Sequence, residues 1–208
     1  PGTMYYTGKE LQQMVEFVGG AKVPGLAAGI ATLKLQSIET IFERMNDMGL
    51  GPYLMGGFIR DILMDRFADD IDLAFASSSE RLLAFARDCD AKDFRFELKE
   101  EGEKVKLEDA VKPSYISLGD QDQPFALEGT VFNANESGDR EIPLRDFTFN
   151  EFLYDPIHHI LIDPSGFGLI DTINDQLRIP VDILDEAAME EWVHGPNGKS
   201  KHPFAHLW

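Results

Sequence analysis

Two aspartates, Asp70 and Asp72, have the residue type and the spacing that could do chemistry. They open the stretch 70–75, in which polar and apolar residues first alternate as in a β-strand. Side chains two apart on a strand point the same way, so both carboxylates lie on one face, close enough to share a divalent cation. The alternative is a face that is merely exposed to solvent, and for an isolated Asp-x-Asp pattern this alternative is the more frequent one.

A glycine pair, Gly56-Gly57, precedes the aspartates and lies between an expected strand at 53–55 and an expected helix at 58–64. Glycine lets backbone N–H groups come close to a phosphate, and a helix N-terminus adds positive potential. A phosphate-binding turn beside a carboxylate pair suits phosphoryl transfer, in which two magnesium ions activate a hydroxyl and neutralise the leaving pyrophosphate. Ordinary tight turns also use glycine pairs, so this pair counts only together with the aspartates.

These residues resemble the signature of bacterial-type poly(A) polymerases and CCA-adding enzymes, which runs Gly-Gly-x-x-Arg-Asp and then Asp-x-Asp. The similar stretches here are Leu54-Met55-Gly56-Gly57-Phe58-Ile59-Arg60-Asp61-Ile62-Leu63-Met64 and Asp69-Asp70-Ile71-Asp72-Leu73-Ala74. A second block resembles the family's Arg-Arg-Asp-Phe-Thr-x-Asn and the stretch after it: Arg145-Asp146-Phe147-Thr148-Phe149-Asn150, Tyr154-Asp155-Pro156 and Leu161-Ile162-Asp163-Pro164. Two ordered motifs make the resemblance specific, and it covers residues 38–180.

The resemblance implies an α+β protein with the polymerase-β-like nucleotidyltransferase fold, a small mixed sheet backed by helices. It implies that Asp70 and Asp72 bind two Mg²⁺ ions, and that Gly56 and Gly57 help to hold a nucleoside triphosphate.

The same resemblance implies that Arg145, Asp146 and Asn150 line the sugar and phosphates of the nucleotide. Arg60 and Asp61 also match the family pattern. Either Arg60 belongs to the nucleotide site, or the pair braces the loop from its helix.

A third carboxylate often completes such sites from a neighbouring strand. The matching stretch is Glu128-Gly129-Thr130-Val131-Phe132-Asn133, which resembles the family's Glu-x-Thr-x-Phe-Arg strand. Glu128 is therefore the candidate third catalytic carboxylate. The alternative is an ordinary surface glutamate, since Asn133 replaces the final arginine of the pattern.

The chain departs from the family at several positions. Leu144 stands where the family has the first arginine of Arg-Arg-Asp, and Glu151 replaces a residue that is usually small. The neck motif Glu-Asp-x-x-Arg, which reads the incoming base, has no match in residues 180–186. We also find no sequence for the helical neck, body and tail that hold transfer RNA in these enzymes, because too few residues follow.

Composition limits the partners. The chain has 208 residues, with 19 basic against 37 acidic residues and a net charge of −18. Proteins that grip a nucleic-acid backbone usually present clustered Lys and Arg, so strong RNA binding by this chain alone is not expected. We expect no membrane segment and no secretion signal, which predicts a cytoplasmic or organelle-matrix location.

The remaining pattern predicts the elements around the motifs. We expect three parts: an irregular arm over 1–32, whose first three residues are a cloning remnant; a head domain over 33–180; and a C-terminal helix with a mobile tail over 181–208. The expected elements are helices at 11–17, 35–48, 77–86 (with Ser77 and Glu80 as a capping box) and 183–193, and strands at 53–55, 70–75, 94–98, 105–107, 115–118, 125–132 and 160–162.

Single cysteine and histidine residues are given structural interpretations. Cys89 falls on the apolar side of its helix and is expected to be a buried small hydrophobe. His158 and His159 are interpreted as structural, and His202 and His206 have metal-ligand spacing, but Pro203 interrupts the helix they would need.

The sequence therefore predicts a template-independent nucleotidyltransferase that transfers a nucleotidyl group from ATP or CTP to a hydroxyl acceptor, the 3′ end of RNA or tRNA. Two alternatives stay open. One is a stand-alone transferase acting on a protein or small molecule, and the other is a non-catalytic nucleotide-binding module with a degraded site.

Overall fold

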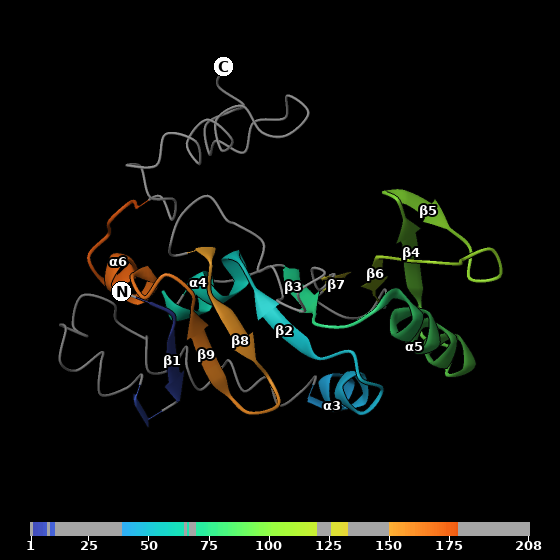
Figure 1. Ribbon diagram of the computed structural model, residues 1–208, viewed down its shortest axis with the longest axis horizontal. Helices are drawn as coiled ribbons and strands as arrows, with labels where there is room; N and C mark the ends of the chain where they lie inside the picture. The colour runs from blue at the N-terminus through green and yellow to red at the C-terminus, as the bar shows by residue number, and fades with distance from the viewer. Residues whose placement is uncertain are drawn as a thin grey trace, which may run out of the picture.

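The computed structural model shows one mixed β-sheet with short helices packed against it (Figure 1). It describes residues 2–7, 9–10, 39–64, 66, 70–119, 126–132 and 150–178. The nine strands lie in the order β1-β9-β8-β2-β3-β7-β6-β4-β5. The strands are β1 (Met4–Thr7), β2 (Pro52–Met55), β3 (Asp70–Phe75), β4 (Phe96–Glu100), β5 (Glu103–Val105), β6 (Tyr115–Leu118), β7 (Ala126–Val131), β8 (Leu153–Asp155) and β9 (Ile160–Asp163), and the helices are α3 (Glu39–Asp47), α4 (Gly57–Leu63), α5 (Ser79–Ala91) and α6 (Gly168–Ile173).

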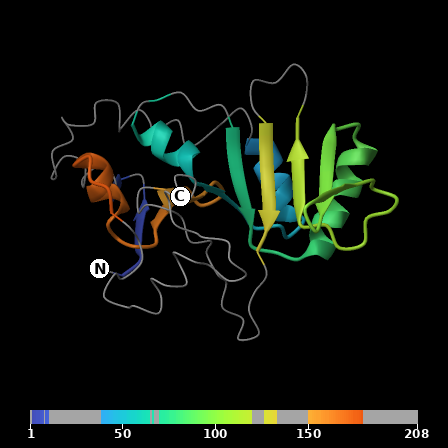
Figure 2. The same ribbon diagram turned by 90° about the horizontal axis from the view of Figure 1, so that it is seen from above.

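Helices α3 and α5 pack on one face of the sheet. Figure 2 shows α3, in blue, behind the row formed by β3, β7, β6 and β4. Ile71, Leu73 and Phe75 of β3 are at most 2% exposed and belong to the same core as the buried faces of both helices. The alternation along β3 therefore directs these apolar side chains to the helices and leaves Asp70 and Asp72 on the other face.

Strand pairing in the centre of the sheet confirms the predicted α+β fold. Strand β3 pairs antiparallel with β2 and parallel with β7, while β6 pairs antiparallel with β7 and β4. The predicted strands at 70–75 and 115–118 have the predicted bounds. The strands predicted at 94–98 and 105–107 are found as β4 and β5, which pair as a hairpin that turns at Glu101 and Gly102. The predicted helix at 35–48 is confirmed where it is described, as α3.

The cap of α5 is one residue later than predicted. Ser78 is the N-cap, and its hydroxyl accepts a hydrogen bond from the Arg81 amide at 3.3 Å. Ser77 instead donates from Oγ to the Gly49 carbonyl oxygen at 2.8 Å, and Arg81 Nη1 donates to the same carbonyl at 3.1 Å. The capping-box interpretation of Ser77 is wrong, because the N-cap is Ser78. Ser77 and Arg81 instead connect the start of α5 to Gly49 in the loop after α3.

Three elements were not predicted from the sequence: β1, β8 and α6. Strand β8 has three residues and β1 has four, too short for a periodicity to stand out. Strand β1 pairs with β9 at the edge of the sheet, where the sequence predicted an irregular arm. The rest of that arm from residue 11 lies outside the described residues, as do the predicted helix at 183–193 and the tail.

Helix α6 is capped by a residue from the preceding strand. The buried Asp163 carboxylate accepts hydrogen bonds from the amides of Gly166, Gly168 and Leu169 at 3.1–3.2 Å. Burial raises the pKa of the Asp163 carboxyl above its ordinary value, and the three amide hydrogen bonds oppose that shift. Asp163 lies five and six residues before the Gly168 and Leu169 amides that it caps. The usual N-cap pattern is therefore missing at the start of α6, which explains why the local sequence did not indicate this helix.

Among the described helices, none has the length and apolar character needed to cross a membrane.

Candidate functional site

The sheet register brings the third predicted carboxylate beside the aspartate pair. In the parallel ladder, Asp72 is the partner of Glu128, and Asp70 is the partner of Ala126. Paired residues on neighbouring strands share a face, so Asp70, Asp72 and Glu128 all lie on the face opposite α3 and α5. Asp70 is exposed, whereas Asp72 and Glu128 are half-buried.

These carboxylates are not gathered into a ready metal cage. Across the described ranges, no group of three or more His, Cys, Asp or Glu side chains is close enough together to hold a metal ion. The chemistry of the donors nevertheless suits a hard divalent cation, because carboxylate oxygens are the protein ligands that Mg²⁺ prefers. This face of the sheet therefore carries carboxylates, the ligand type that Mg²⁺ prefers, spread over β3 and β7.

The glycine turn begins one residue after the position on β2 that pairs with Asp72. Met55, at the end of β2, is the register partner of Asp72, and Gly56 follows it. Gly56 has φ 71° and ψ −147°, a conformation that essentially only glycine adopts, and it caps α4 without a side-chain hydrogen bond. Glycine at this position is therefore required by the backbone that leads from β2 into α4, immediately beside Asp72.

Arg60 links α4 to the second motif. Its Nη1 donates to Asn150 Oδ1 at 2.6 Å, while Nε and Nη2 donate to Asp61 Oδ1 at 3.0 and 2.9 Å. The structure therefore brings together two predicted site residues, Arg60 and Asn150, from motifs far apart in the chain. Arg145 and Asp146, which were also predicted to line the nucleotide, lie outside the described residues.

Two residues that the sequence did not single out share the carboxylate face. Ser117 of β6 is the register partner of Glu128, and Tyr115 lies two residues before it on the same side of the strand. The alternation along β6 could have indicated their common face. Their position next to Glu128 depends on the pairing of β6 with β7, which the local pattern does not specify.

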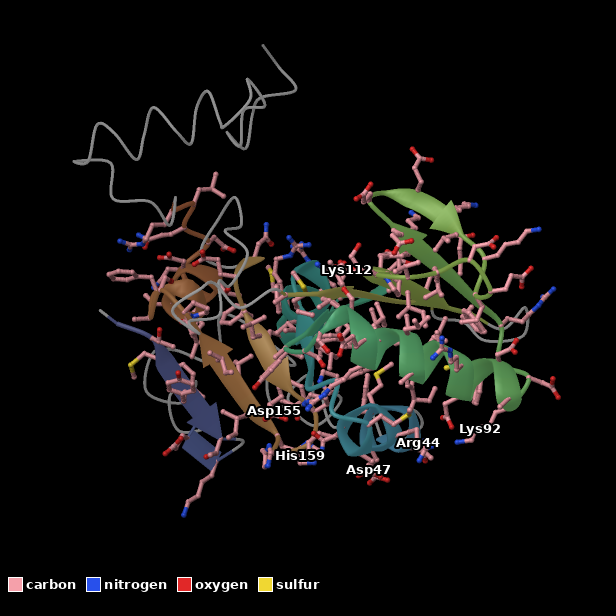
Figure 3. All side chains as sticks on the ribbon, turned by 45° about the vertical axis from the view of Figure 1, so that its right-hand side comes forward. Arg44, Asp47, Lys92, Lys112, Asp155 and His159 are labelled. Carbon is pink, nitrogen blue, oxygen red and sulfur yellow. The ribbon has the colours of Figure 1, made fainter. Side chains whose placement is uncertain are left out.

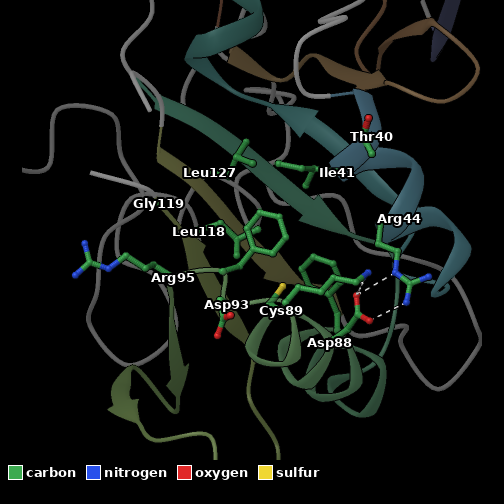
Figure 4. Close-up of a pocket in the computed structure, with 13 residues that line it drawn as sticks. Thr40, Ile41, Arg44, Asp88, Cys89, Asp93, Arg95, Leu118, Gly119 and Leu127 are labelled. Atoms are coloured by element: carbon green, nitrogen blue, oxygen red, sulfur yellow. Dashed lines mark hydrogen bonds and ion pairs between the residues drawn. The ribbon is translucent and has the colours of Figure 1, made fainter. Parts of the chain in front are cut away.

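A cavity of about 400 Å³ lies away from the carboxylates, on the face covered by the helices (Figure 4). Leu118 and Leu127 of the sheet and Ile41 of α3 line it. Asp88 and Arg44 at its rim are joined by an ion pair of 2.8 Å. The hydrogen bond from Arg44 holds the pKa of the Asp88 carboxyl down to about 2.

Cys89 also lines this cavity and is 4% exposed. Burial raises the pKa of the Cys89 thiol to about 11, so the thiol stays protonated near neutral pH. The prediction of a buried, chemically quiet cysteine is confirmed. Because the cavity and the carboxylates lie on opposite faces, the cavity is not part of the candidate site.

The adjacent histidines have local structural contacts. Nδ1 of His158 lies 2.8 Å from Asp155 Oδ2, and Nδ1 of His159 lies 3.0 Å from the Tyr154 hydroxyl. Figure 3 shows Asp155 and His159 together at the turn between β8 and β9. These contacts agree with the structural interpretation of both residues, while His202 and His206 lie outside the described part of the chain.

Solved structures of larger proteins share this fold. A CCA-adding enzyme in complex with ATP has a TM-score of 0.56 and 16% identity, over 91% of this chain and 42% of that chain. A CCA-adding enzyme with CTP gives 0.53 and 16% over 86% and 36% of the two chains. A tRNA nucleotidyltransferase complexed with a primer tRNA and an incoming ATP analog gives 0.51 and 19% over 74% and 41%. The chain thus spans less than half the length of each of these proteins.

A comparison with curated proteins finds no match. In contrast, residues 52–178 match the family described as the poly A polymerase head domain. The match covers more than half of the chain and includes the glycine turn, the aspartate pair and Glu128. This chain therefore belongs to the poly(A) polymerase head-domain family.

Proposed function

We propose that this head domain catalyses template-independent transfer of a nucleotidyl group from ATP or CTP to a hydroxyl acceptor, the 3′ end of RNA or tRNA. The observation that carries the proposal is the register of β3 with its two neighbours, which places Asp72 between Glu128 of β7 and Met55 of β2, the residue before the Gly56 turn. Acidic side chains on neighbouring strands repel one another unless a positive charge compensates. Carboxylate oxygens are also the ligands that Mg²⁺ prefers, so this pair of acids supports a reaction that uses a divalent cation.

Asp70 and Asp72 would hold magnesium at this face, with Glu128 as the third carboxylate. When bound, two Mg²⁺ ions would lower the pKa of the attacking hydroxyl and neutralise charge on the leaving pyrophosphate. The backbone of Gly56 and Gly57 would approach the triphosphate, because neither residue has a side chain in the way.

The nucleotide would lie between the turn and the second motif. Asn150 is held by Arg60 at 2.6 Å, so Arg60 fixes the side of the site that meets the sugar. Arg145 and Asp146 complete the proposed contacts to the sugar and phosphates.

The proteins of similar fold support the choice of substrates. Their structures are described with ATP, with CTP, and with a primer tRNA and an ATP analog. The net charge of −18 argues that this chain alone does not supply the grip on RNA. The same charge favours the alternative of a protein or small-molecule acceptor.

An acceptor assay tests the proposal. The chain would be incubated with Mg²⁺ and α-labelled ATP or CTP, with a tRNA lacking its 3′-terminal nucleotides, an unstructured oligoribonucleotide, or no RNA. We expect label at the 3′ end of RNA. Label on protein alone would favour the other acceptor class. Magnesium-dependent triphosphate binding without label in any product would support the non-catalytic alternative.

Arg60→Lys tests the link between the two motifs. Lysine keeps the charge but lacks the planar fork that holds Asp61 and Asn150 together. We expect kcat/KM for the nucleotide to fall on the order of tenfold, because at least one charge-assisted hydrogen bond is lost. Steady-state kinetics with labelled ATP and CTP would measure the change.

Arg44→Lys is the matched control, because Arg44 lies on α3 and pairs with Asp88 on the other side of the sheet. It should leave the kinetics unchanged. Wild-type kinetics for Arg60→Lys would show that the link to Asn150 has no part in the reaction.

A further inference from the structure

Tyr115 lies diagonally across the β6–β7 ladder from Glu128. Ser117 is opposite Glu128, and Tyr115 is opposite Thr130, the next residue on the same face of β7. Diagonal neighbours of this kind are about 7–8 Å apart at Cα, which a tyrosine side chain can span. The register therefore places the Tyr115 hydroxyl within reach of the Glu128 carboxylate.

Glu128 acts directly on the Tyr115 hydroxyl. Burial, and then the hydrogen bond and charge of Glu128, raise the pKa of Tyr115 to about 12. Tyrosine is protonated near neutral pH in any case, because its ordinary pKa is about 10. A protonated phenol beside a carboxylate is the donor of that hydrogen bond. One carboxylate oxygen of Glu128 is thus engaged by Tyr115, and the carboxylate has a second oxygen for the reaction site.

Tyr115 is itself fixed by its neighbours. The Ser117 side chain is hydrogen-bonded to Tyr115, and the Lys99 ammonium lies 4.6 Å from the centroid of the Tyr115 ring. An ammonium over an aromatic ring is attracted by the ring's negative face. Ser117 therefore restrains the Tyr115 hydroxyl and Lys99 restrains its ring, so the side chain is suited to hold another group in place.

We propose that Tyr115 is a positioning residue, which donates a hydrogen bond to one oxygen of Glu128 and so fixes the other for its role beside Asp72. A glutamate has several rotatable bonds, and an unrestrained one would lose side-chain entropy each time the reaction site assembles. Hydrogen-bond partners that orient a ligating or reacting carboxylate typically contribute tenfold or more to affinity or rate. This inference rests on the proposed function, because it gives Glu128 a part in the reaction.

Tyr115→Phe is the direct test, since phenylalanine keeps the ring under Lys99 and removes only the hydroxyl. We expect kcat to fall on the order of tenfold with the nucleotide KM nearly unchanged, and Mn²⁺ affinity measured by electron paramagnetic resonance to fall by a similar factor. Tyr53→Phe on β2, which lies on the same face of the sheet, is the matched control and should change neither value. An unchanged or increased kcat with unchanged Mn²⁺ affinity in Tyr115→Phe would overturn the proposal.

A double-mutant cycle with Glu128→Gln separates positioning from a general effect on the sheet. If Tyr115 acts through Glu128, Tyr115→Phe should have little further effect on kcat once Glu128 is glutamine. The same fold-loss in both backgrounds would contradict the proposal. The two hypotheses also fail separately: an active Asp72→Ala would overturn the proposed function, whereas an inactive Asp72→Ala with a fully active Tyr115→Phe would overturn only the role of Tyr115.

Discussion

Asp72→Ala is expected to lower nucleotidyl transfer by about a thousandfold or more while the chain stays folded. The expected loss reflects removal of a proposed magnesium ligand, since bound metal contributes several kcal/mol of transition-state stabilisation and each 1.36 kcal/mol is about tenfold in rate. Asp72 is half-buried on the face away from the helices, so its removal leaves no hole in the core. Incorporation of α-labelled ATP or CTP measures activity, and circular dichroism with thermal unfolding checks the fold.

Glu97→Gln provides a matched control for Asp72→Ala. Glu97 of β4 is the register partner of Ser117, which in turn is opposite Glu128, so it lies at the far end of the same row of residues. Its loss of charge should leave incorporation near the wild-type level, because two strands separate it from β3. Equal losses in both variants would indicate a general charge effect on this face. Wild-type incorporation by Asp72→Ala would refute the proposed metal site.

The sequence predicted the central strands because their patterns are local. Residues 70–75 and 115–118 alternate between a face buried against helices and a polar face, and this period of two is visible without any knowledge of the fold. Strand β8 and helix α6 were missed because their stability comes from distant partners. Helix α6 is capped from the buried Asp163 in β9, and β8 is held between β2 and β9.

The candidate site was predictable only in part for the same reason. The spacing of Asp70 and Asp72 indicated a shared face, and the resemblance to a family suggested Glu128. No local pattern specifies that Glu128 pairs with Asp72 or that Tyr115 reaches Glu128, because the register of β7 with β3 and β6 is a long-range property. Arg60 illustrates the limit well: its motif was recognised, but its contact with Asn150 became apparent only in the fold.

The proposed RNA acceptor has to be reconciled with the charge and the length of this chain. The carboxylates and the glycine turn, to which we assign the proposed transfer step, lie inside the matched region 52–178. This chain covers only 36% and 42% of two CCA-adding enzymes of similar fold, so those proteins are much longer than it is. With a net charge of −18, the chain would need a basic partner or region to bind RNA tightly. A low affinity for RNA is thus compatible with an intact transfer site.

Gly129→Ala is expected to destabilise the fold strongly, although it adds one methyl group. Gly129 is buried on the helix-facing side of β7, and a Cβ there would lie 2.1 Å from Phe75 Cε2 and 2.3 Å from Phe75 Cζ. Phe75 is 0% exposed, so its ring has little room to retreat. Overpacking of this kind costs about 1–3 kcal/mol, which exceeds the roughly 0.5–1 kcal/mol that alanine gains over glycine in a strand. Urea unfolding would measure the loss as a lower free energy of unfolding.

Two further variants would test whether contact with the Phe75 ring causes that destabilisation. Phe75→Leu shortens the side chain that lies over Gly129, so adding it to Gly129→Ala should cost less than the sum of the two single changes. Gly119→Ala is the control, because a Cβ at Gly119 meets no atom within 4 Å and the substitution should be nearly neutral. Strictly additive losses, or a wild-type unfolding curve for Gly129→Ala, would mean that the ring does not close over the β7 backbone. The close contact between the Phe75 ring and Gly129 therefore joins the parallel pair β3 and β7, the same pair whose opposite face carries Asp72 and Glu128.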